Sequence, residues 1–99
     1  TLSQILSVDA KNSYAYYYRA LTYDAINNYR KAIEDYIKVT KITPKNDMAF
    51  YLLGVDYDSV SDFKNAKLAY AKFIALSGTK QTEYTKYAKK RLVELKNIK

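Results

Sequence analysis

Apolar and polar residues alternate along the chain with the spacing of amphipathic helices. The first apolar face comprises Tyr16, Ala20, Tyr23 and Ile26, and the second comprises Tyr29, Ala32, Ile33, Tyr36, Val39 and Ile42. Asn27 and Asn28 separate the two faces, and Pro44 ends the second because proline disfavours helical backbone in the residue before it. No segment alternates with the period of two that strands require. The pattern therefore predicts an all-α fold.

The helical pattern repeats after 34 residues. Residues 13–46 align with residues 47–80 without a gap, and aromatic residues recur at equivalent positions. The seven identical pairs are Ala15/Ala49, Tyr17/Tyr51, Tyr23/Tyr57, Asp24/Asp58, Ala32/Ala66, Tyr36/Tyr70 and Lys38/Lys72. Each unit is predicted to form two helices. Candidate N-caps recur too: Asn12 and Asn46 precede the first helices, and Asn28 and Asp62 precede the second.

One difference between the units involves two positions together. Arg19 and Asp35 of the first unit are replaced by Leu53 and Ala69 in the second. A charged pair in one unit and an apolar pair in the other predict that Arg19 and Asp35 form a partly buried ion pair between the two helices. The alternative is that Arg19 extends alone to solvent.

The repeated pattern resembles the tetratricopeptide repeat. The signature W-x2-L-G-x2-Y, then A-x3-F, then P is met by Tyr16, Ala20, Tyr23, Ala32, Tyr36 and Pro44, with Arg19 in place of Leu and, in the second unit, Gly78 in place of Pro. The resemblance implies one domain, residues 1–99, folded as a right-handed α-α superhelix, the tetratricopeptide-repeat solenoid. Its expected parts are the tail of a preceding repeat helix (1–12), two repeats (13–46 and 47–80) and a C-terminal capping helix (81–99).

The resemblance also implies a concave groove, lined by the first helix of each unit, that binds peptides. Its residues would be Tyr14, Tyr17, Leu21 and Asp24 in the first repeat, Met48, Tyr51, Val55 and Asp58 in the second, and Lys86 and Lys89 in the last helix. These residues predict an aromatic and aliphatic strip with an acidic edge. Tyrosine offers a large contact area and a polar hydroxyl. In the alternative interpretation, the tyrosines pack only against neighbouring helices and the aspartates are solvated. The Lys, Asn and Arg clamp with which some members hold chaperone C-termini is not matched, since only Lys86 fits.

The net charge of +7 is concentrated near the C-terminus. Residues 80–99 contain seven basic and two acidic residues, which gives +5. Lys89, Lys90 and Arg91 form a candidate basic patch for nucleic acid or another acidic surface. The alternative is a solvating cap, because terminal repeats need a polar outer face.

Composition argues against catalysis. The chain has no Cys and no His, and so lacks a thiol nucleophile, an imidazole base and the usual zinc ligands. Its two glycines cannot form a phosphate-binding loop. The segment 56–62 resembles the start of a calcium loop, but Ser61 and Lys67 replace the required Gly and Glu. We therefore expect no enzyme activity, no metal and no cofactor.

The sequence favours a protein or peptide partner. The alternatives are a structural spacer or self-association element of a larger protein and, less favoured, nucleic-acid binding through the last helix. The chain begins with Thr1 and suggests a piece of a longer protein. It shows no signal peptide and no apolar run long enough to span a membrane. It does not assign a compartment, and the cytoplasm is only the default.

Overall fold

Five helices make up the fold. The computed structural model describes the backbone of residues 2–78 and 82–97, and the side chains of these ranges from residue 13 onward. The helices are α1 (Leu2–Ala25), α2 (Tyr29–Ile42), α3 (Asp47–Ser59), α4 (Phe63–Ser77) and α5 (Glu83–Lys96). Within the described ranges all regular structure is helical, which confirms the all-α prediction.

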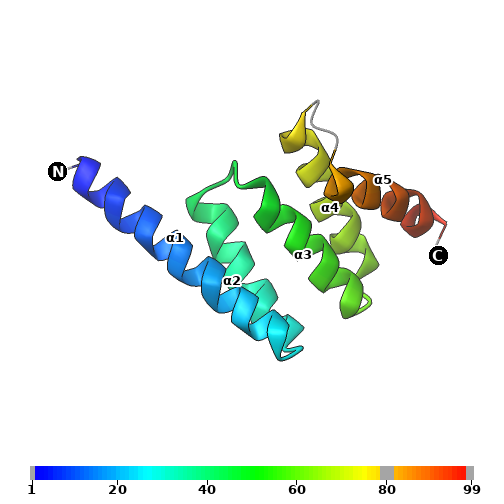
Figure 1. Cartoon of the computed structure of the whole chain (residues 1–99), viewed down its shortest axis with the longest axis horizontal. Helices are drawn as coiled ribbons and strands as arrows, with labels where there is room; N and C mark the ends of the chain where they lie inside the picture. Colours follow the sequence, from blue (N-terminus) through cyan, green and yellow to red (C-terminus); the bar gives the residue numbers. More distant parts are fainter. Residues whose placement is uncertain (1, 79–81, 98–99) are drawn as a thin grey trace.

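The helices form an array that follows the order of the chain. Each helix packs mainly against the helices before and after it, and the N- and C-termini lie at opposite ends of the long axis (Figure 1). The molecule measures 49 × 32 × 21 Å. Short connections force consecutive helices to run antiparallel, so α1/α2 and α3/α4 form two hairpins, with α5 as an additional helix after them.

The turn inside each hairpin is repeated in detail. Asn27 and Ser61, which are 34 positions apart, both adopt left-handed backbone, with φ values of 62° and 64°. The following residues, Asn28 and Asp62, each donate a backbone hydrogen bond of 2.8 Å to a tyrosine carbonyl of the preceding helix. This geometry closes the helix ends in the manner of a Schellman motif. Ile26, predicted on the buried face, instead lies in the turn and is exposed, because α1 ends at Ala25.

The predicted caps are confirmed at two of the four positions. The Asn46 side chain accepts from the Ala49 N–H at 3.2 Å, and the Asp62 side chain accepts from the Asn65 N–H at 3.4 Å. Asn28 lies at the predicted cap position of α2, but its side chain makes no capping hydrogen bond. The Asn12 prediction is wrong, because Asn12 lies inside α1.

The start of the first repeat is not marked by a break in the helix. α1 is continuous for 24 residues, although the sequence predicted a new helix after residue 12. It contains no proline or glycine, so nothing in its backbone chemistry stops helix propagation at that point. That residues 1–12 correspond to the end of a preceding repeat stays a prediction.

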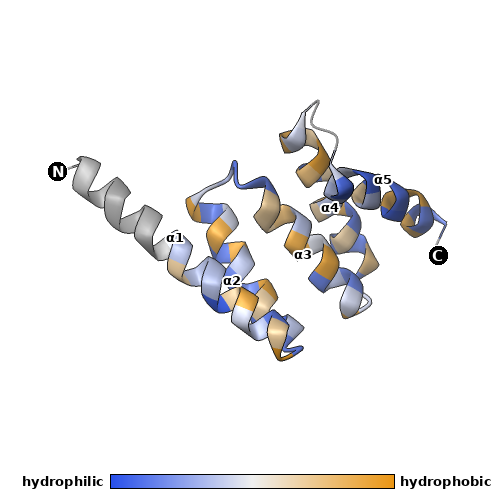
Figure 2. Cartoon of the chain, viewed as in Figure 1, coloured by the Kyte–Doolittle hydropathy of each residue, from blue (hydrophilic) through white to orange (hydrophobic). Residues whose placement is uncertain are grey.

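Small residues lie where the helices approach each other, and large aromatic residues fill the space between them. The four alanines Ala20, Ala32, Ala49 and Ala66 are fully buried. Tyr36 of α2 is buried in the first hairpin, and Tyr70 of α4 is buried in the second. The two tyrosines occupy equivalent positions of the two repeats. Apolar and polar residues alternate along each of the helices from α2 to α5, as amphipathic packing requires (Figure 2).

Arg19 and Asp35 form the predicted ion pair. Arg19 Nε and Nη2 donate to the two carboxylate oxygens of Asp35 at 2.7 and 2.8 Å, a bidentate geometry that joins α1 to α2. The Asp35 side chain is 3% exposed, whereas that of Arg19 is 53% exposed. The pair therefore buries its acid and leaves its base at the surface.

Gly54 of α3 lies directly against the ring of Tyr70 in α4. A Cβ atom at Gly54 would lie 2.7 Å from Cδ1 of the buried Tyr70 ring. We expect Gly54→Ala to destabilise the domain by about 1 kcal/mol, because overpacking of about 1–3 kcal/mol outweighs a gain of about 1 kcal/mol in helix propensity. Urea unfolding followed by circular dichroism measures this change. A Gly54→Ala variant more stable than the wild type would contradict the close contact between Gly54 and the Tyr70 ring. The matched control is Ala20→Gly, at the equivalent position in α1.

Candidate peptide-binding groove

The groove predicted from the sequence lies on α1, α3 and α5, whose shared surface is called the inner face below, and Tyr17 is its central residue on α1. The Tyr17 ring is half-buried and makes edge-on contacts with Tyr18 at 5.9 Å and with the buried Tyr36 at 6.0 Å between ring centroids. Burial raises the pKa of the Tyr17 hydroxyl above its ordinary value, with smaller contributions from Tyr18 and Asp47. The hydroxyl is therefore neutral at physiological pH and can donate a hydrogen bond.

A cavity opens beside Tyr17. Its volume is about 670 Å³, which is within the range of ligand-binding pockets. Its walls come from the middle of α1, the turn between α2 and α3, and the first turn of α3. The lining residues are Ser13, Tyr14, Tyr17, Tyr18, Thr43, Pro44, Lys45, Asn46 and Met48. Tyr14 and Tyr18 are 66% and 63% exposed, so two large aromatic side chains border the cavity with most of their surface free.

Tyr51 is the centre of a second aromatic group on α3. Its ring lies 5.1 Å from Phe73 and 5.0 Å from Tyr84, and 6.3 Å from both Tyr70 and Tyr87. Tyr84 and Tyr87 are both exposed and extend the aromatic surface onto α5, which the sequence did not predict. Tyr84 and Tyr87 are three residues apart, and this spacing could have shown in the sequence that both lie on one face of the last helix.

The aliphatic residues of the predicted strip are less accessible than the sequence suggested. Leu21 packs against the core of the first hairpin, and Val55 and Met48 pack against that of the second. All three are only partly exposed. The free surface of the inner face is therefore mainly aromatic.

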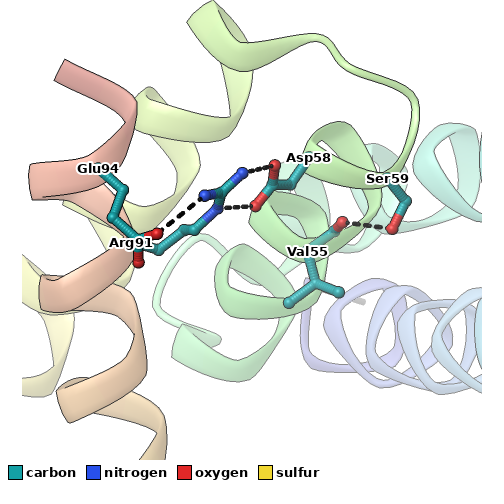
Figure 3. Close-up of polar contacts among 5 residues, drawn as sticks. All are labelled: Val55, Asp58, Ser59, Arg91 and Glu94. Carbon is teal, nitrogen blue, oxygen red and sulfur yellow. Dashed lines mark hydrogen bonds and ion pairs between the residues drawn. The ribbon is translucent and has the colours of Figure 1, made fainter. Parts of the chain in front are cut away.

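The predicted acidic edge is absent, because both aspartates bind other side chains. Asp24 accepts a hydrogen bond of 2.7 Å from the Tyr36 hydroxyl. Asp58 accepts two hydrogen bonds from Arg91 of α5, one from Nη2 at 2.7 Å and one from Nε. Figure 3 shows the Arg91 guanidinium between Asp58 and Glu94. The prediction of solvated aspartates is also wrong, since both lie at joints between helices.

The basic residues of α5 are divided between different roles. Arg91 joins α5 to α3 and is not free to contribute to the predicted basic patch with Lys89 and Lys90. Lys89 is two positions from both Tyr87 and Arg91, a rotation of about 200° around the helix, so it lies on roughly the opposite side of α5 from these residues. Helix geometry therefore places the exposed Lys89 away from the aromatic surface. Lys86 is exposed and lies 3.9 Å from Glu83. Much of α5 is hydrophilic (Figure 2).

The described residues offer no metal site and no transmembrane helix. No group of three or more acidic, His or Cys side chains among them could hold a metal ion. None of the described helices combines the length and the apolar character that a bilayer span requires.

The fold and its aromatic inner face define a helical-repeat scaffold. The tetratricopeptide repeat family model matches residues 13–46. The chain is also similar to the crystal structure of the Sgt2 TPR domain from Aspergillus fumigatus, with a TM-score of 0.74 and 32% identity. That match covers 95% of this chain and 60% of the Sgt2 chain. No curated protein sequence matches. The chain is therefore a tetratricopeptide repeat domain with the all-α solenoid fold.

Tetratricopeptide repeat domains generally mediate protein–protein interactions and are typically non-catalytic. Each repeat leaves an apolar face that a neighbouring element covers, and the resulting array presents an extended surface.

Proposed function

We propose that this domain is a non-catalytic interaction module that binds a peptide or partner segment on its inner face. The observation that carries the proposal is the cavity of about 670 Å³ bordered by the exposed rings of Tyr14 and Tyr18. In this proposal an apolar or aromatic side chain of the peptide enters the cavity, and the peptide continues across Tyr17 toward Tyr51. Rigid aromatic side chains lose little entropy on binding, which favours such contacts.

The two aspartates of this surface are not free to recognise a charged peptide residue. Asp24 and Asp58 are bound within the domain, so they do not select a basic peptide residue. Burial raises the pKa of both Tyr17 and Tyr51 above the ordinary value, so both hydroxyls are neutral. The preferred peptide therefore has apolar anchors and backbone groups that accept hydrogen bonds from tyrosine hydroxyls.

The test begins by selecting peptides from a random display library on the purified domain. We expect the double variant Tyr14→Ala/Tyr18→Ala to bind selected peptides at least about tenfold more weakly, because interface aromatics are frequent binding hot spots. Its unfolding free energy should change by less than about 1 kcal/mol, since both side chains are mostly exposed. Isothermal titration calorimetry and urea unfolding measure the two quantities.

The matched control is Leu68→Ala, which removes an exposed apolar side chain from α4, outside the inner face. It should leave peptide affinity unchanged. Selected peptides that bind the double variant as tightly as the wild type would refute the proposed site. Two alternatives stay untested predictions: a structural or self-association role, and binding to an acidic surface through α5. Because Arg91 binds Asp58, only Lys89 and Lys90 remain of the predicted basic patch.

A further inference from the structure

Two carboxyl groups meet at the joint between the first and second repeats. Asp56 of α3 is 2% exposed, and its carboxyl group lies within interaction range of that of Asp24 on α1. Asp24 Oδ2 also accepts from the Tyr36 hydroxyl of α2 at 2.7 Å. Asp24 Oδ1 and Asp56 Oδ2 are both buried, and within the described part of the chain no donor hydrogen-bonds to either oxygen.

The joint between α3 and α5 uses the same repeat position with the opposite chemistry. Asp58 is the repeat equivalent of Asp24, and it faces Arg91, which lies 33 residues later. Asp24 faces Asp56, which lies 32 residues later (56 − 24). The second joint is therefore closed by a cation, whereas the first is closed by a second acid.

Two ionised carboxylates cannot share a buried site without a cation. Among the described residues, no Lys or Arg forms an ion pair with Asp24 or Asp56. The groups that face the pair are the Tyr36 hydroxyl from α2 and, behind it, Tyr17 from α1. Like-charge repulsion and burial both favour one shared proton.

We propose that the joint between α1 and α3 is a proton-dependent latch, held closed by a carboxyl–carboxylate hydrogen bond between Asp56 and Asp24. When the pair holds one proton, the O–H of one carboxyl group donates to the carboxylate of the other. When that proton is lost, two negative charges face each other and the joint opens. The Asp24–Tyr36–Tyr17 contacts transmit the change to the inner face.

The pH range of the latch follows from burial. Burial raises the pKa of Asp56 from 3.8 to about 9, and the hydrogen bond with Asp24 and its charge add to the effect. Between these values the native state binds more protons than the unfolded state. The folding equilibrium constant therefore falls as pH rises, by up to about tenfold per pH unit, and levels off above about pH 9.

The experiment compares the wild type with Asp56→Asn, which keeps the shape and the hydrogen-bond donor of the protonated acid. Urea unfolding measures both proteins between about pH 5 and about pH 8. We expect the ratio of their folding constants to shift in favour of Asp56→Asn by up to about tenfold per pH unit. Other titrating groups are common to both proteins and cancel in this ratio. Equal pH dependence of the two proteins would overturn the latch.

The matched control is Asp58→Asn at the second joint. It strands Arg91 and should lower stability at every pH, the opposite of Asp56→Asn. Infrared spectroscopy gives a readout that does not require the variants to fold: the wild type should show a protonated carboxyl band at neutral pH. NMR should show the Tyr17 ring resonances shifting as this band disappears with rising pH, and the Tyr17 hydroxyl does not interfere because its own pKa is raised. Absence of the band in the folded wild type would also overturn the proposal.

Discussion

Arg19→Leu is expected to be among the most destabilising single substitutions in this domain. The substitution leaves the Asp35 carboxylate, which is 3% exposed, without the two hydrogen bonds that it accepts from Arg19. Stranding a buried carboxylate without its cation costs about 3–5 kcal/mol in proteins. Because Arg19 itself reaches the surface, water can approach Asp35 after the substitution, so we expect the lower end of that range. Urea unfolding near neutral pH measures the loss.

The second repeat supplies the control for this prediction. Leu53 and Ala69 occupy the equivalent positions there, and both are buried. The double variant Arg19→Leu/Asp35→Ala recreates this apolar pair, and replacing an ion pair by packed apolar residues is often neutral or stabilising. We therefore expect the double variant to recover most of the stability lost in Arg19→Leu. An Arg19→Leu variant as stable as the wild type would show that Asp35 does not depend on its partner.

Tyr36→Phe and Tyr70→Phe are expected to have different effects, although the two tyrosines are repeat equivalents. The Tyr36 hydroxyl donates to Asp24 at 2.7 Å, and a hydrogen bond to a charged group contributes about 1.5–3 kcal/mol. The Tyr70 hydroxyl is buried, and no partner for it exists within the described part of the chain. Tyr36→Phe should therefore lower the unfolding free energy by about 2 kcal/mol, whereas Tyr70→Phe should leave it unchanged or raise it.

The two tyrosine variants are each other's control, because both remove one oxygen atom from a fully buried ring. Thermal or urea unfolding of the two proteins under identical conditions gives the difference directly. Equal losses would mean that the hydroxyl of Tyr70 has a partner of similar strength to Asp24. A loss confined to Tyr70→Phe would contradict the hydrogen-bond assignment of both residues.

Short-range patterns were sufficient to predict the scaffold. The spacing of Tyr16, Ala20 and Tyr23, and its recurrence after 34 residues, predicted the helices, because a helix places such positions on one face whatever its neighbours are. The Arg19–Asp35 pair was also predictable, since both positions differ between the repeats. Asn12 was misplaced because an N-cap residue can equally lie inside a helix that nothing interrupts.

Contacts across the joints were not predictable in the same way. Asp24 and Asp58 are the same residue type at equivalent positions of the two repeats. Asp24 nevertheless faces Asp56, whereas Asp58 faces Arg91. Sequence alone suggested a free acidic edge, because the rotation of α3 and α5 relative to the preceding helices is not encoded in helical periodicity.

The sequence by itself determined an all-α repeat of helix pairs, the residues that form the core of each pair, and the clustering of positive charge in the last helix. The tertiary structure decided which of these residues remain available: it placed Tyr14 and Tyr18 at an open cavity, bound Arg91 to Asp58, and buried Asp56 against Asp24. The physical reason is range. Helical periodicity is set by backbone geometry within a few residues, whereas accessibility and charge pairing depend on side chains of different helices, 33 residues apart for Arg91 and Asp58, which meet only when the helices pack.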